Sequence, residues 1–76
     1  MYSMLLTVKD TRGEPFEARV DMIRRSNGLQ WTAALWANGY PAHIVSGDAK
    51  RCADIARTLQ EAIIFSDLRV PTELVT

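Results

Sequence analysis

The sequence predicts an α+β fold, a four-stranded antiparallel meander with one C-terminal amphipathic helix packed on one face (ββββα). Two observations lead to this prediction. Apolar and polar residues alternate with the period of a half-buried strand through most of residues 2–46, interrupted by turn signals at 10–15, 27–28 and 38–41. The spacing of apolar residues then changes to that of a helix. We expect residues 1–70 to form one domain and 71–76 to form a frayed tail.

The first two strands follow from their alternation. The segment at 2–9 places four apolar side chains on one face, Tyr2, Met4, Leu6 and Val8. The segment at 16–25 is split more cleanly. Its apolar positions are Phe16, Ala18, Val20 and Met22, and its intervening charged positions are Glu17, Arg19 and Asp21. Such a split predicts an antiparallel sheet with one face in water.

The dipeptide Asn27-Gly28 predicts a hairpin with a two-residue type I′ loop. With Ser26 opposite Leu29, the register pairs Met22 with Ala33, Val20 with Leu35 and Arg19 with Trp36. One face of this hairpin is then wholly apolar, so a slip of one residue would place charges in the core. The register sends Trp31 into the core and Trp36 to the opposite face, where we expect Arg19 to stack on the indole.

The rest of the chain is expected to turn at 38–41, form a short strand at 42–46, and then form a helix. Pro41 predicts an edge position for this strand. Gly47 is expected to end it, and Ser46 or Asp48 to cap a helix that runs to Ile64. The expected buried stripe of the helix is Cys52, Ile55, Ala56, Leu59 and Ile63. Leu68 and Val70 are expected to close one end of the core.

A chain of 76 residues buries only roughly 60% of the surface that its unfolded form exposes, so something is expected to supplement its core. The single cysteine, Cys52, leaves no disulfide, and the single histidine, His43, leaves no zinc ligand set. We therefore predict no metal, cofactor or small-molecule substrate. A protein partner or a second copy of the chain is the expected supplement.

Charge and motifs narrow the functional classes. Nine basic and nine acidic side chains argue against a protein whose affinity comes from neutralising phosphates. The longest apolar runs are far shorter than the ~20 residues of a membrane-spanning helix. His43 has no catalytic partner at a recognisable spacing, so we predict that the protein is not an enzyme. A lone cysteine without a secretory leader predicts a cytoplasmic location.

The predicted partner-binding site is the sheet face that the helix leaves uncovered. Its residues are Trp36, Arg19, Ile23, Arg25, Tyr40 and Leu5. Ala34 shares this face, and Ile44 joins it if the fourth strand has the matching register. Trp, Tyr and Arg dominate binding hot spots, so we predict a non-enzymatic inhibitor or regulator that occludes or organises a larger complex, alone or as a homodimer. The simpler interpretation is that Trp36 covers the stem of Arg19 or packs under the C-terminal tail.

A second hypothesis is nucleic-acid binding through Arg24, Arg25 and Arg19, near the predicted hairpin. Single-strand binders stack bases on aromatic side chains beside a basic groove, and Trp36 with Arg19 has that composition. Glu17 and Asp21 on the same face, together with the neutral net charge, argue against it.

The segment "IVSGDAKRCADIARTLQEAI" is similar to the strand-to-helix junction of HicB-type antitoxin domains. The similarity rests on Ser46, Gly47, Glu61, Ala62 and Ile63, covers about a quarter of the chain, and implies an antitoxin-like regulator. The rest of the chain departs from that family, including its proline-rich strand-end motif. In size and general kind, the chain also resembles small phage-encoded inhibitors of bacterial defence complexes, such as anti-CRISPR proteins.

Overall fold

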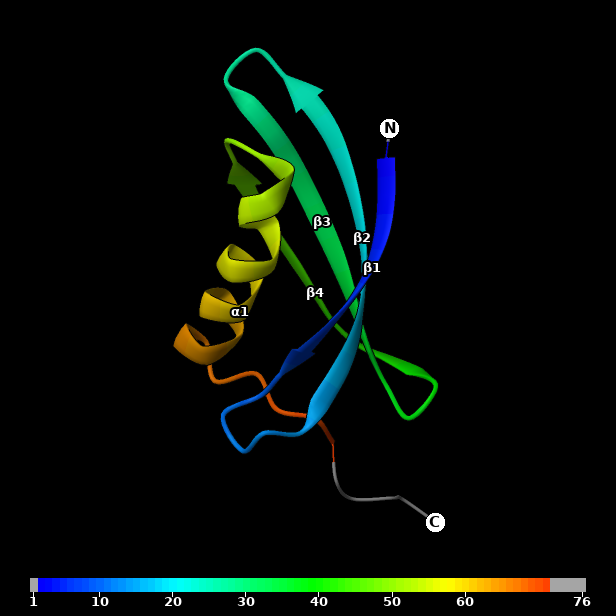
Figure 1. Ribbon diagram of the computed structural model, residues 1–76. Coiled ribbons are helices and arrows are strands. Elements are labelled where there is room, and N and C mark those ends of the chain that lie inside the picture. Colours follow the sequence, from blue (N-terminus) through cyan, green and yellow to red (C-terminus); the bar gives the residue numbers. More distant parts are fainter. Residues whose placement is uncertain (1, 72–76) are drawn as a thin grey trace.

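The computed structural model describes residues 2–71, which form one antiparallel sheet followed by a helix (Figure 1). The strands are β1 (Tyr2–Lys9), β2 (Pro15–Arg25), β3 (Gly28–Ala37) and β4 (Tyr40–Ala49). A 3₁₀ turn at Cys52–Asp54 leads into α1 (Ile55–Phe65). The spatial order β1-β2-β3-β4 follows the chain, which confirms the predicted ββββα meander. Of the predicted tail, Pro71 is exposed, and residues 72–76 lie outside the described residues.

The core lies between α1 and one face of the sheet. Three helix residues, Ile55, Leu59 and Ile63, are fully buried at i, i+4 and i+8, the spacing that forms one stripe on a helix. They pack against the even-numbered residues of β2 and the odd-numbered residues of β3, including Trp31, which is 1% exposed. The predicted inward orientation of Trp31 is therefore confirmed. Val70 is buried and Leu68 packs against the same core, as expected.

The hairpin between β2 and β3 forms, but its predicted register was wrong by two residues. The loop is Ser26–Asn27, so Arg25 pairs with Gly28 and Val20 pairs with Ala33. Gly28 begins β3 at φ 135°, a conformation that L side chains rarely adopt. A shift of two residues preserves the period of side-chain alternation, so each residue keeps the face that the sequence predicted.

The fourth strand is longer than predicted and Gly47 does not end it. Asn38 and Gly39, both at positive φ, form the turn before β4, which begins at Tyr40. A β-bulge follows near Pro41, and β4 then continues through Gly47 to Ala49 as the predicted edge strand. Gly47 lies directly opposite Trp31, and its missing side chain provides the space that the indole fills.

Because β4 is longer, the helix begins later than predicted. Ser46 and Asp48 are strand residues and cap nothing, and Asp54 precedes the first residue of α1. Two residues were wrongly assigned to the buried stripe of the helix. Cys52 is exposed in the 3₁₀ turn, and Ala56 is exposed on α1. On the exposed side of α1, Arg57 and Glu61 form an ion pair at 3.7 Å.

Asp10 joins the β1–β2 turn to the C-terminal segment. Its buried carboxylate accepts hydrogen bonds from the amides of Arg12, Glu14 and Val70 at 2.8–2.9 Å, and Arg12 adds an ion pair at 3.0 Å. Burial alone would raise the pKa of Asp10, but the hydrogen bonds from Val70, Glu14 and Arg12 outweigh burial and hold the pKa well below its usual range. This cluster therefore holds Val70 against the core.

Candidate protein-binding surface

The sheet face opposite α1, called the outer face below, is covered by no described element (Figure 1). Its centre is a row of direct cross-strand neighbours, Leu5, Arg19, Ala34 and Ile44, one from each strand. We call this set the apolar row after its three aliphatic members, and Arg19 is its one charged residue. The aliphatic side chains at its two ends are largely in water, Leu5 at 69% and Ile44 at 76% exposure. The register of β4 thus brings Ile44 onto this face.

Trp36 lies beside the apolar row and is partly buried. Although Arg19 pairs across the strands with Ala34, its guanidinium carbon lies 4.1 Å from the centre of the Trp36 ring. The predicted stacking contact is therefore confirmed, through a diagonal neighbour instead of a direct one. Arg19 also contacts Glu17 at 3.3 Å. At such an exposed site the cation–π contact contributes roughly 0.5–1 kcal/mol, which favours the stacked arrangement of the indole and the guanidinium.

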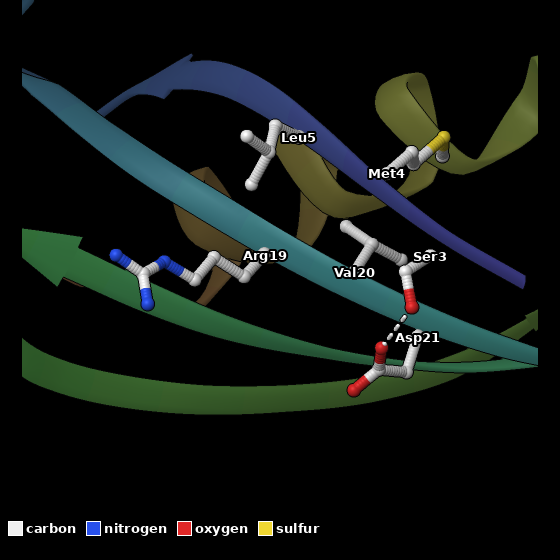
Figure 2. A pocket seen from close by; sticks show the side chains of 6 residues that line it. All are labelled: Ser3, Met4, Leu5, Arg19, Val20 and Asp21. Atoms are coloured by element: carbon white, nitrogen blue, oxygen red, sulfur yellow. Dashed lines mark hydrogen bonds between the residues drawn. The ribbon is translucent and has the colours of Figure 1, made fainter.

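Next to the apolar row lies a polar row of Ser3, Asp21, Thr32 and Ser46. Figure 2 shows Arg19 extending away from Asp21, whose carboxylate accepts a hydrogen bond of 2.7 Å from the Ser3 hydroxyl. A shallow pocket of about 350 Å³ on this face is lined by Ser3, Asp21, Arg19 and Leu5. Within residues 2–71, Asp21 has no ion pair. The outer face therefore combines an exposed apolar centre with a carboxylate that no described cation neutralises.

The structure brings together only part of the predicted binding site. Leu5, Arg19 and Trp36 are neighbours. Ile23, 40% exposed, and Arg25 lie on the same face beyond the polar row, where Arg25 donates to the Gln30 side chain at 3.1 Å. Tyr40 is exposed at the start of β4, but it pairs directly with Ala37 of the core cluster. The β-bulge near Pro41 therefore places Tyr40 on the helix side of the sheet, and its assignment to the outer face was wrong. Sequence patterns could not rank these residues because their proximity depends on the register.

The three arginines of the nucleic-acid hypothesis do not form one cluster. Arg24 follows the core-facing parity of β2, whereas Arg19 and Arg25 lie on the outer face. Arg25 follows Arg19 by six positions along β2, roughly 20 Å at ~3.3 Å per residue. A nucleic-acid backbone would need a continuous basic path, and the described residues of the outer face do not provide one.

The groups with chemical potential are also dispersed. His43 packs edge-on against the Phe16 ring, with centroids 5.8 Å apart and an interplanar angle of 79°. The Cys52 thiol lies 3.9 Å from the Met22 sulfur, a weak contact. Among residues 2–71 no group of three or more His, Cys, Asp or Glu side chains could hold a metal ion.

Two further exposed apolar side chains, missed in the sequence, end the helix. Phe65 is 93% exposed and Ile64 is 53% exposed. They lie on α1, outside the buried stripe, so they belong to a different surface from the outer face. The predicted helix ended at Ile64, one residue before Phe65. The exposure of Phe65 is therefore visible only in the structure, where α1 extends to this residue.

Comparison with protein-family models, curated proteins and solved structures found no match to this chain. The similarity to the strand-to-helix junction of HicB-type antitoxins also loses its structural basis, because Ser46 and Gly47 lie within β4 and not at its end. Within residues 2–71 no helix is long and apolar enough to cross a membrane.

Proposed function

We propose that the protein is a non-catalytic binding module whose outer face is covered by a protein partner. In this role it acts as an inhibitor or regulator that occludes or organises a larger complex, as small phage-encoded inhibitors do. The observation that carries the proposal is the apolar row, with Leu5 and Ile44 exposed at both ends and the Arg19–Trp36 stack beside it.

The energetics favour a partner on this face. Covering the exposed parts of two aliphatic side chains such as Leu5 and Ile44 would contribute roughly 1–2 kcal/mol each. Trp36 and Arg19 are the residue types that carry most binding energy at interfaces. Their stacking already favours one arrangement of the two side chains, which lowers the entropy lost on binding. The polar row on the flank supplies hydrogen-bonding groups of the kind found at the edge of an interface.

A lysate pull-down with the tagged 76-residue chain tests this function. We expect Trp36→Asp and Ile44→Glu to lose at least about 90% of the protein captured by the wild type, because each places a carboxylate in the apolar row or directly beside it. Phe65→Asp is the matched control, an equally polar change at a 93% exposed position on α1, and it should capture as the wild type does.

All variants should retain cooperative thermal unfolding, since none alters a fully buried side chain. The proposal is wrong if the captured proteins, including untagged copies of the chain, are the same for Trp36→Asp as for the wild type. Loss of cooperative unfolding in Trp36→Asp would instead place Trp36 in the core.

The exposed thiol of Cys52 supports a reducing compartment, such as the cytoplasm, as the place of action. Cys52 lies on the surface of a chain with no second cysteine. In an oxidising compartment such a thiol would be free to form disulfides between molecules.

A further inference from the structure

We infer that the partner covering the outer face is a second copy of this chain, packed sheet on sheet about a two-fold axis. The axis would run parallel to the strands and between β2 and β3. This inference rests on the proposed function, because it uses the same surface and names its occupant. Its basis is the order of side chains across each row of the sheet.

A two-fold axis of this kind places β1 over β4 of the second copy and β2 over β3. Each row of the outer face then lies over the same row, read in the opposite direction. In the apolar row, Leu5 meets Ile44 of the second copy, and Ile44 meets its Leu5. Arg19 lies over Ala34, the smallest side chain of the row, which leaves space for the aliphatic stem of Arg19 while its guanidinium stays stacked on Trp36 of its own chain. The two most exposed aliphatic side chains of the outer face are thereby covered by each other.

The charged positions are compatible with the same arrangement. Glu17 lies over Trp36 and Asp21 lies over Thr32, so no charge is placed over a like charge. The Thr32 hydroxyl of the second copy can donate to Asp21, the carboxylate that no described cation neutralises. An isologous contact requires such self-complementarity, in which residue i meets j and j meets i.

A two-fold axis that runs across the strands, along the apolar row, is disfavoured. It would place Leu5 over Leu5 and Ile44 over Ile44, but it would also place Arg19 directly over Arg19 at the centre of the contact. Like charges facing each other are destabilising in a packed interface. The charge order along β2 therefore favours the axis parallel to the strands over the axis along the apolar row.

The size of the outer face fits a stable dimer. Four strands spaced ~4.8 Å apart and ten residues long outline roughly 600 Å², which approaches the ~800 Å² that each partner of a specific complex buries. Two twisted sheets pack face to face at about −30°, so the arrangement is a β-sandwich with a helix on each outer side. Pairing through the β1 edge is hindered at Lys9, whose backbone amide and carbonyl are bonded to the Gln60 side chain at 3.0 and 2.6 Å.

The test is the solution mass of the purified 76-residue chain by sedimentation equilibrium, with two variants that are also mixed. We expect the wild type to have twice the 8.5 kDa mass of one chain. Leu5→Lys and Ile44→Glu should each raise the dissociation constant at least ~100-fold, because each homodimer would oppose a charge to an aliphatic side chain twice.

An equimolar mixture of the Leu5→Lys and Ile44→Glu chains should recover the dimer. In the mixed dimer the introduced lysine of one chain meets the introduced glutamate of the other at one contact. At the second contact the unchanged Ile44 meets the unchanged Leu5, so neither charge is left without a partner. No other pairing of the two chains on this face produces that match. Phe65→Asp, on α1, should dimerise as the wild type does and is the control.

Each outcome decides between arrangements. A monomeric wild type overturns the inference without the use of any variant, and the proposed function survives that result if lysate proteins still bind in a Trp36-dependent manner. Dimers that persist in both single variants place the contact elsewhere, and a mixture that stays monomeric overturns the two-fold axis parallel to the strands.

Discussion

Replacing Gly47 by alanine will destabilise the protein, even though alanine is the better strand residue. A Cβ at this position would lie 2.7 Å from Cζ2 of Trp31, closer than real Cβ contacts occur, and 3.0 Å from Cε2, which is also a tight contact. Trp31 is 1% exposed and packed on the core side of the sheet, so the indole has no free space into which to move. Overpacking of this kind costs about 1–3 kcal/mol of unfolding free energy, more than the ~0.5–1 kcal/mol that alanine gains over glycine.

Chemical denaturation measures this loss, and two further variants identify its cause. Ser46→Ala, the neighbouring outward-facing position of β4, should change the unfolding free energy by less than ~0.5 kcal/mol. In a Trp31→Phe background the smaller ring leaves space for the new methyl group, so Gly47→Ala should cost clearly less than in the wild type. Equal costs in both backgrounds would show that Trp31 does not restrict residue 47.

Asp10→Asn will lower the thermal unfolding midpoint by at least about 5 °C, the shift expected when a domain of this size loses roughly one hydrogen bond. The groups that contact the Asp10 carboxylate are all donors, and the carboxamide replaces one acceptor oxygen with a donor. One or more of the amides of Arg12, Glu14 and Val70 then loses its acceptor. Asp48→Asn, the same change at an exposed position of β4, should leave the midpoint within about 2 °C.

The effect of Asp10 depends on pH with a defined sign. Its pKa is lower in the folded chain than the ordinary value of 3.8, so its stabilisation is fully present above that pH. As the pH falls below 3.8 towards the folded pKa, the wild type must lose this contribution and Asp10→Asn has none to lose. The stability difference between the two should therefore shrink from about pH 4 to about pH 2. A difference that stays constant over that interval would show that the Asp10 carboxylate is not the group responsible.

The parts of the fold that depend on alternation could be predicted from the sequence. Trp31 and Trp36 were assigned to opposite faces correctly although the register was wrong, because an error of two residues preserves parity. The loop itself was misplaced because Asn-Gly is a type I′ signal only where both residues adopt positive φ. That condition holds at Asn38-Gly39. In the β2–β3 hairpin, Gly28 has positive φ but is already the first residue of β3.

The end of β4 could not be predicted from local signals. Gly47 has the local character of a strand breaker, but its role is a tertiary contact with Trp31, a residue far away in the sequence. The error moved the helix start and with it Cys52, which was expected in the core and is exposed. Of the candidate site, the alternation correctly placed Leu5, Arg19 and Trp36 on the outer face, but the β-bulge of β4 moved Tyr40 to the other side. Only the cross-strand register shows that Leu5, Arg19 and Ile44 form one row.

The central claim is that Trp36 points outward onto a face that only another protein covers, and fluorescence quenching by acrylamide tests it most directly. Emission of Trp36 is obtained by subtracting the Trp36→Phe spectrum, which contains Trp31 alone. In the Ile44→Glu background we expect acrylamide to quench Trp36 readily and Trp31 to be shielded. In the chain with Ile44 unchanged, we expect Trp36 to become shielded as the protein concentration rises. Trp36 shielded as strongly as Trp31 in the Ile44→Glu background would contradict the claim.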